Sequence, residues 1–220
     1  MKTVGLFGGT FDPVHRGHLD VARVVREALS LDEIWFIPAR HPPHRTAPTA
    51  SAPHRFAMVA LALAGQTEMK VCDIEMAGAG PSYTIDTLTA VEARWPTLAG
   101  RLCFIAGADA FLDIATWRSW TALLDRAHFA VVSRPGCSAP SLRAALPELA
   151  ARMHDAPAPL SAAPRIFLVD ATTSAVSSTE ARQALRQGSA ITGLLPEPVA
   201  EYARRQALYT GMDAQEAPRE

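Results

Sequence analysis

Short runs of apolar residues alternate along the chain with longer segments in which apolar residues recur every three or four positions. The short runs, most of which end near glycine or proline, are typical of buried strands. We expect these strands at residues 3–7, 34–37, 70–75, 102–106, 129–133 and 166–169. The longer segments predict helices with one buried face. We expect these helices at residues 17–29, 53–63, 83–95, 178–187 and 197–209.

Strands and helices that alternate in this order predict an α/β fold with a doubly wound, mainly parallel sheet covered on both faces. We expect one domain over residues 1–212, with a small helical part at its C-terminal end, and a frayed tail at residues 213–220. Residues 39–53 contain four prolines and predict a mobile loop over the edge of the sheet. Sheets of this kind bind ligands at the carboxyl ends of their strands, near the point where the strand order reverses.

The composition is that of a globular protein, because 49% of the 220 residues are hydrophobic and 20% are charged. This provides ample apolar material for a buried core. The 21 lysines and arginines nearly balance the 22 aspartates and glutamates. That balance argues against a protein that coats nucleic acid or binds a membrane through a basic surface. We therefore expect no nucleic-acid partner and no membrane partner.

Other sequence features bear on where the protein acts and on whether it contains disulfides or zinc. The longest apolar run, residues 56–64, is too short to cross a bilayer, and the first residues lack the pattern of a secretory signal. The cysteines, Cys72, Cys103 and Cys137, are odd in number and widely spaced. This spacing predicts neither a disulfide framework nor a zinc site. Together these features indicate a cytoplasmic protein.

The candidate chemistry begins in the turn after the first expected strand, residues 8–18, Gly-Gly-Thr-Phe-Asp-Pro-Val-His-Arg-Gly-His. The segment matches neither the G-x-G-x-x-G dinucleotide fingerprint nor a P-loop, and the only lysines are Lys2 and Lys70. Its glycines let the backbone approach a ligand, and His15 and His18 share one helix face. At a helix start, unpaired N–H groups and the helix dipole favour anions. The segment therefore predicts a phosphate site; two histidines that merely cap the helix are the alternative.

Residues 9–18 resemble the H-x-G-H signature of the nucleotidyltransferase superfamily, which implies a Rossmann-like nucleotidyltransferase fold. Residues 176–182, Val-Ser-Ser-Thr-Glu-Ala-Arg, are similar to the second part of the signature, the I-S-S-T-x-I-R pattern at a helix start. Alone, Ser-Ser-Thr-Glu is typical of a helix capping box. Together with the first motif it favours a phosphate site, in which Arg182 offers a planar fork to phosphate oxygens.

Within the superfamily, the chain resembles the bacterial nicotinate-nucleotide adenylyltransferase family. The segments that match it are residues 37–45, 54–58, 80–88, 104–111 with Trp117, 193–196 and 199–202. The resemblance implies a step of NAD biosynthesis, in which ATP and nicotinate mononucleotide give nicotinate adenine dinucleotide and pyrophosphate, with Mg²⁺ carried in on the ATP phosphates. Two alternatives stay open: another superfamily enzyme of the pantetheine-phosphate adenylyltransferase type, and a nucleotide sensor without turnover. The oligomeric state also stays open.

The resemblance further implies which residues bind ATP. They come from three segments: Gly8, Gly9, Thr10, Phe11, His15 and His18; Gly107 and Asp109; and Ser178, Thr179 and Arg182. The catalytic pair, His15 and His18, would stabilise negative charge on the α-phosphate and the leaving pyrophosphate. Neither would need to remove a proton, because a phosphate monoester has a second pKa of about 6 and is mostly a dianion at neutral pH. For Asp109, a helix N-cap is the alternative.

A second set of residues would bind the nicotinate mononucleotide: Arg45, Tyr83, Thr84, Trp117 and Arg134. Trp117 would stack on the pyridine ring, because a cationic ring lies favourably on the face of an indole; ordinary core packing is the alternative. Thr84 and the neighbouring backbone would contact the carboxylate. Arg45 stands where the family commonly has lysine, so that a planar fork replaces a point charge there.

Overall fold

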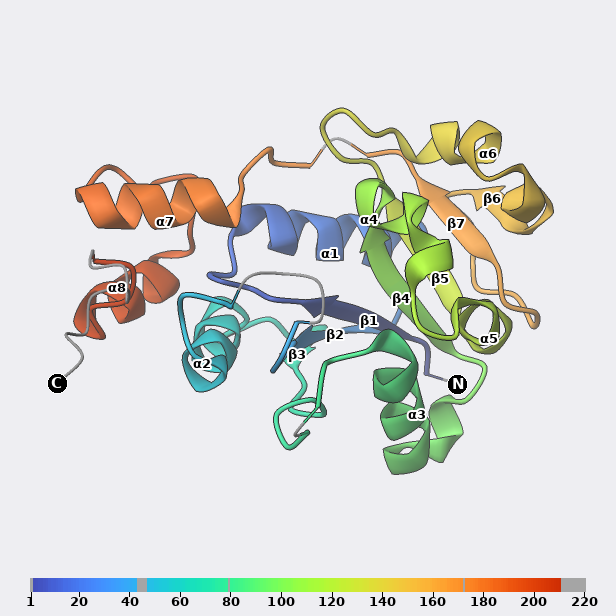
Figure 1. The fold of residues 1–220 in the computed structure, drawn as a ribbon, viewed down its shortest axis with the longest axis horizontal. Helices are drawn as coiled ribbons and strands as arrows, with labels where there is room; N and C mark the ends of the chain where they lie inside the picture. The colour runs from blue at the N-terminus through green and yellow to red at the C-terminus, as the bar shows by residue number, and fades with distance from the viewer. Residues whose placement is uncertain (1, 43–46, 79, 172, 211–220) are drawn as a thin grey trace, which may run out of the picture.

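A parallel sheet of seven strands runs through the centre of the part of the chain that the structure describes (Figure 1). This computed structural model describes residues 2–42, 47–78, 80–171 and 173–210. The strands are β1 (Val4–Gly9), β2 (Glu33–Pro38), β3 (Met69–Val71), β4 (Leu102–Gly107), β5 (His128–Val132), β6 (Met153–Asp155) and β7 (Ile166–Val169). They lie in the order β3-β2-β1-β4-β5-β7-β6, and each neighbouring pair is parallel. The order reverses between β1 and β4, so the sheet is doubly wound.

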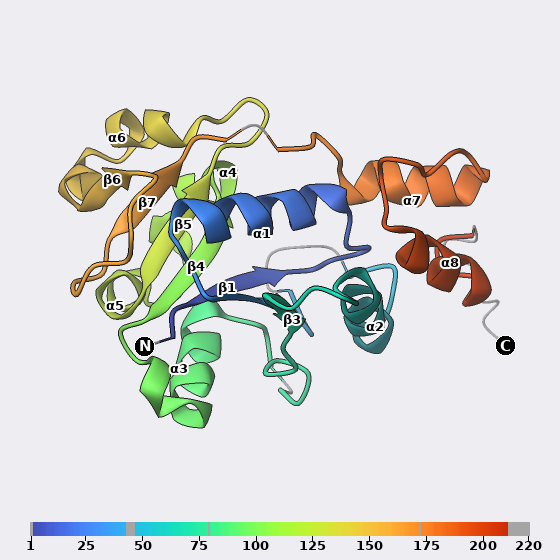
Figure 2. The ribbon, with the colours of Figure 1, turned by 180° about the vertical axis from the view of Figure 1, so that it is seen from behind.

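Helices cover both faces of this sheet (Figures 1 and 2). They are α1 (Arg16–Ala28), α2 (Ala52–Ala62), α3 (Thr84–Arg94), α4 (Ala108–Leu112), α5 (Trp120–Arg126), α6 (Leu142–Ala145), α7 (Ser178–Gln187) and α8 (Glu197–Arg205). Helices α1, α2, α7 and α8 contribute to one hydrophobic core, and α3 to α6 contribute to the other. Alternate strand residues enter the two cores: Ile34 and Phe36 lie in the first, and Trp35 and Ile37 in the second.

The predicted doubly wound α/β fold is confirmed, with differences at its shorter elements. Strand β3 covers less than the expected residues 70–75, because the chain turns there and the N–H of Met76 donates to the carbonyl of Asp73 at 2.8 Å. Helix α8 ends before residue 209, since Ala207 and Tyr209 have positive φ angles of 50° and 67°. Strand β6 and helices α4 to α6 were not expected, because such short elements carry no readable periodicity.

The C-terminal end of the chain is described only as far as residue 210. Helices α7 and α8 lie together at one end of the molecule, beside α2, in both views (Figures 1 and 2). The expected tail at residues 213–220 lies outside the described residues. Within those residues, every helix is too short or too polar to cross a membrane.

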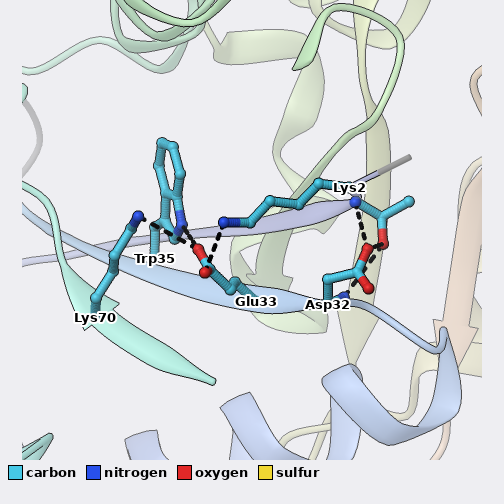
Figure 3. Close-up of polar contacts among 6 residues, drawn as sticks. Lys2, Asp32, Glu33, Trp35 and Lys70 are labelled. Atoms are coloured by element: carbon cyan, nitrogen blue, oxygen red, sulfur yellow. Dashed lines mark hydrogen bonds and ion pairs between the residues drawn. The ribbon is translucent and has the colours of Figure 1, made fainter. Parts of the chain in front are cut away.

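The two lysines of the chain meet at Glu33, at the amino ends of β1, β2 and β3 (Figure 3). Lys2 Nζ lies 2.6 Å from Oε1 of Glu33, and Lys70 Nζ lies 3.3 Å from Oε2. The indole N–H of Trp35 donates to Oε2 at 2.7 Å, and Lys70 Nζ lies 4.2 Å from the centre of the Trp35 ring. Burial raises the pKa of Glu33, but the hydrogen bonds from Lys2, Trp35 and Lys70 outweigh burial and hold the pKa below its usual value. The cluster therefore joins three strands at the end of the sheet remote from their carboxyl ends.

The substitution Glu33→Gln should lower the free energy of unfolding by about 1 kcal/mol at low salt, because both ammonium groups lose their ion pair. At about 1 M salt, where screening acts within about 3 Å, the loss should be smaller. Urea denaturation at both salt concentrations measures the difference. Glu27→Gln removes the same charge from an exposed position on α1 and serves as the control. An equal loss at both salt concentrations would show that the ion pairs contribute nothing.

Candidate active site

A cleft of about 580 Å³ opens at the carboxyl ends of β1 and β4, where the strand order reverses. Its walls come from segments that are far apart in the sequence. They are residues 7–12 with His18, parts of 39–42 and 47–49, residues 82–84, parts of 105–118 with Arg134, and Ser178 with Arg182. The topology places ligand sites of such sheets at this point.

Most of the residues expected to bind substrates line this cleft. They are Gly8, Gly9, Thr10, Phe11, His18, Gly107, Asp109, Ser178 and Arg182 from the ATP set, and Tyr83, Thr84, Trp117 and Arg134 from the other set. His15 and Thr179 lie outside the lining; Oγ1 of Thr179 instead accepts from Nη2 of Arg182 at 3.2 Å. Arg45 lies outside the described residues. The roles of these residues remain predictions.

The turn between β1 and α1 is tightly packed where β1 ends. A side chain on Gly9 would clash with the Phe11 ring, because a Cβ atom there would lie 2.8 Å from Cζ. Phe11 has a φ of 50° and is 2% exposed. This left-handed conformation costs a bulky residue on the order of 1–3 kcal/mol, so the surrounding structure must hold it. The Phe11 ring packs edge-on against His18, with 4.9 Å between the ring centres.

His15 and His18 stack with their ring centres 3.6 Å apart, but their environments differ. The backbone N–H of His15 donates to Nδ1 of His18 at 3.2 Å, so that a neutral His18 carries its proton on Nε2. His15 is 3% exposed. Burial and the charge of Arg134 lower the pKa of His15 to about 4, although Asp20 acts in the opposite direction. His15 is therefore neutral at pH 7 and lies outside the cleft lining, whereas His18 lines the cleft. The role of both imidazoles at the phosphates stays a prediction.

Helix α7 packs the second motif against the turn of the first. Ser177 caps this helix, because its hydroxyl accepts the backbone N–H of Glu180 at 3.1 Å, which is one of the two hydrogen bonds of the expected capping box. The hydroxyl of Ser178 donates to the carbonyl of Pro13 at 3.0 Å, and Nη1 of Arg182 donates to the carbonyl of Asp12 at 2.7 Å. The two halves of the signature, about 170 residues apart, are thus in direct contact.

The carboxylate of Asp109 and the guanidinium of Arg134 both lie close to Gly107, at the end of β4. A Cβ atom on Gly107 would lie 3.0 Å from Nε of Arg134 and would collide with the carboxylate of Asp109. Gly107 itself is the N-cap residue of α4, and Asp109 lies in the first turn of the helix. The N-cap interpretation of Asp109 is therefore wrong. Its exposed carboxylate lines the cleft instead.

Aromatic and cationic side chains gather in the part of the cleft lining that residues 82–84 and 116–118 form. The half-buried Trp117 packs edge-on against Phe129, with 6.4 Å between the ring centres. The guanidinium of Arg118 lies 5.1 Å from the centre of the Tyr83 ring, and its Nη1 lies 3.3 Å from Oδ2 of Asp86. Arg118 was not expected at this site, although its position directly after Trp117 was a usable signal.

The chain is similar to known proteins in sequence and in fold. The sequence model of the cytidylyltransferase-like family matches residues 6–184. Two relatives named probable nicotinate-nucleotide adenylyltransferase, from Aeromonas salmonicida and Shewanella pealeana, are 43% and 39% identical over 209 residues. Each alignment covers 94% of this chain and 96% of the relative. The solved structure of a Plasmodium falciparum nicotinic acid mononucleotide adenylyltransferase complexed with NaAD has a similar fold, with a TM-score of 0.73, 19% identity and coverage of 95% and 98% of the two chains.

The low pKa of His15 predicts that stability falls between pH 6.5 and pH 4. In that window the unfolded chain takes up a proton on His15 that the folded protein binds only near pH 4. The free energy of unfolding should therefore decrease by about 3 kcal/mol over the window as the pH is lowered. Urea denaturation at several pH values should show that His15→Asn removes much of this slope. The exposed His41→Asn variant should retain the slope; an unchanged slope in His15→Asn would mean that the folded imidazole takes up its proton near pH 6.5.

Proposed function

The chain belongs to the nicotinate-nucleotide adenylyltransferases, within the wider cytidylyltransferase-like family, and on this basis we propose how its cleft performs the reaction. The protein transfers the adenylyl group of ATP to nicotinate mononucleotide. The products are nicotinate adenine dinucleotide and pyrophosphate, so the reaction is a step of NAD biosynthesis. The relatives give no support to a pantetheine-phosphate enzyme or a sensor without turnover, since they carry the name of this enzyme.

One observation carries the assignment of this activity to the cleft. Both halves of the phosphate-binding pattern line it, and α7 donates two hydrogen bonds to the turn that follows β1. The turn and the start of α7 thus face one space from two sides. A triphosphate in that space would meet the backbone N–H groups of Thr10 and Phe11, the imidazole of His18 and the guanidinium of Arg182.

The reaction requires stabilisation of negative charge more than it requires proton transfer. An oxygen of the mononucleotide phosphate attacks the α-phosphorus of ATP, and the bond to the bridging oxygen breaks as pyrophosphate leaves with the electron pair. Nε2–H of His18 would donate to the phosphate oxygens as negative charge moves onto the leaving group. His15, neutral and stacked behind it, would hold His18 in place through its backbone N–H. Asp109 would accept hydrogen bonds from ribose hydroxyls.

The part of the lining that residues 82–84 and 116–118 form fits the pyridine nucleotide. Trp117 offers one side of its indole to a cationic ring, and Tyr83 and Thr84 begin α3, whose first N–H groups can take the carboxylate. Arg118 and Arg134 add positive charge to the lining of the cleft. Arg45, outside the described residues, stays a proposed phosphate contact.

Nucleotidyl transfer from ATP calls for a divalent cation, which we propose to be Mg²⁺ bound to the ATP phosphates. Among the described residues, no three His, Cys, Asp or Glu side chains lie together as a metal site would require. A cation held mainly by nucleotide oxygens and water fits this donor set, because Mg²⁺ keeps several waters and needs only one or two protein ligands. Bound there, it would neutralise part of the charge on the leaving pyrophosphate.

The wild-type protein should release pyrophosphate from ATP and nicotinate mononucleotide, and His18→Ala should lower kcat by about 10²–10³, because one preorganised donor to the developing charge is lost. A coupled pyrophosphate assay measures both, and circular dichroism checks that the variant is folded. His154→Ala, at β6 and away from the cleft, is the matched control. A kcat within twofold of wild type would remove His18 from the mechanism. Turnover with pantetheine phosphate in place of the mononucleotide would favour the alternative enzyme.

Trp117→Ala should raise the KM for nicotinate mononucleotide about tenfold and the KM for ATP much less, because only the pyridine ring would stack on the indole. Steady-state kinetics with each substrate varied in turn gives both values. Trp120→Ala is the control, since Trp120 lies outside the cleft lining and packs against the second core. Equal increases in both KM values would identify Trp117 as a packing residue only.

A further inference from the structure

Arg55 is a charged side chain buried beneath the nucleotide-binding turn. It comes from α2 and is only 1% exposed. Its guanidinium donates to three backbone carbonyls: Nη1 to Thr10 at 2.6 Å, Nε to Ala50 at 3.1 Å and Nη2 to Arg40 at 3.3 Å. A buried charge is costly unless it is fully hydrogen-bonded. These three bonds therefore fix the position of the guanidinium and of the carbonyls that accept from it.

The shortest of these bonds acts on the peptide group that the proposed ATP site uses. The carbonyl of Thr10 and the N–H of Phe11 belong to one peptide plane, and in a trans peptide the two groups point in opposite directions. Because Arg55 donates to the carbonyl of Thr10, the N–H of Phe11 points away from Arg55. Both Thr10 and Phe11 line the cleft. The orientation of this donor is thus set by a residue that does not line the cleft.

The turn between β1 and α1 also holds a buried carboxylate, that of Asp12, whose negative charge favours the protonated form of Arg55. Asp12 is 6% exposed, and its carboxylate accepts the N–H groups of Thr49 at 2.7 Å and Ala50 at 3.0 Å. The hydroxyl of Tyr209 donates to the same carboxylate at 2.7 Å. Asp12 and Arg55 therefore both bind residues 49–50, because Asp12 accepts their N–H groups and Arg55 donates to the carbonyl of Ala50. Phe11, with its left-handed backbone, lies in the sequence between Thr10, whose carbonyl Arg55 binds, and Asp12, whose carboxylate accepts three hydrogen bonds.

We propose that Arg55 is a positioning residue for ATP: it aims the N–H of Phe11 at the phosphates by holding the carbonyl of Thr10. The inference rests on the function proposed above and adds to it a residue that touches neither substrate. A lysine at this position keeps the charge but replaces a planar fork with a point charge, and cannot reproduce three donors in these directions.

Arg55→Lys should therefore weaken ATP binding about tenfold, as expected for one misdirected hydrogen bond to a charged group, and should change the KM for nicotinate mononucleotide less than twofold. Calorimetric titration with ATP alone and steady-state kinetics measure the two effects. Val25→Ala, a core substitution on α1 away from the cleft, is the matched control for lost stability. It should leave the ATP dissociation constant and the KM for nicotinate mononucleotide unchanged. An unchanged ATP dissociation constant in folded Arg55→Lys would overturn the proposal.

The wild-type protein offers a second test that does not depend on the variant folding. In protein labelled with ¹⁵N at phenylalanine, ATP should shift the amide resonance of Phe11 and slow its hydrogen exchange. A Phe11 amide indifferent to saturating ATP would also overturn the proposal. Wild-type protein that binds ATP but releases no pyrophosphate would instead contradict the proposed function, so the two failures are distinguishable.

Discussion

Side chains from two helices that are far from it in the sequence donate hydrogen bonds to the backbone carbonyls of the turn between β1 and α1. Arg55 on α2 holds the carbonyl of Thr10, while Arg182 and Ser178 on α7 hold those of Asp12 and Pro13. Buried carbonyls need such partners, and here the partners also determine the shape of the turn. A turn that is already rigid loses little freedom when a polyphosphate arrives. The cost of organising the site is therefore met during folding, not during each catalytic cycle.

Much of the fold was readable from the sequence, because long amphipathic segments and apolar runs dictate which face is buried. Helix α1 and strands β1, β2, β4, β5 and β7 lie close to where the pattern predicted them. Helices α4 to α6 were missed because their length gives no period, and β6 because three residues suffice when β7 supplies the pairing. The end of the strand expected at residues 70–75 was set by a turn that the alternation did not reveal.

The site was predictable as a set of motifs but not as a geometry. The sequence indicated which segments would meet, since their positions after strands place them at one edge of the sheet. It could not show that His15 is buried behind His18, because that depends on the approach of a remote segment: a Cβ atom on Gly17 would lie 2.9 Å from the carbonyl of Ser174 and 3.1 Å from Nδ1 of His15. Nor could it show that Arg55 serves the turn, because its partners are backbone atoms brought near by the fold.

The two lysines and the arginines of the cleft lie at opposite ends of the sheet. Both lysines bind Glu33 at the amino ends of the strands, whereas Arg118, Arg134 and Arg182 line the cleft at the carboxyl ends. Guanidinium groups keep their protons at any pH at which a protein stays folded, and His15 adds no charge near neutrality. The attraction that these three arginines exert on a polyphosphate should thus not change through loss of their own protons on moderate acidification. Dissolved ions, which screen charges over about 10 Å at about 0.1 M, should instead weaken this attraction as the salt concentration rises.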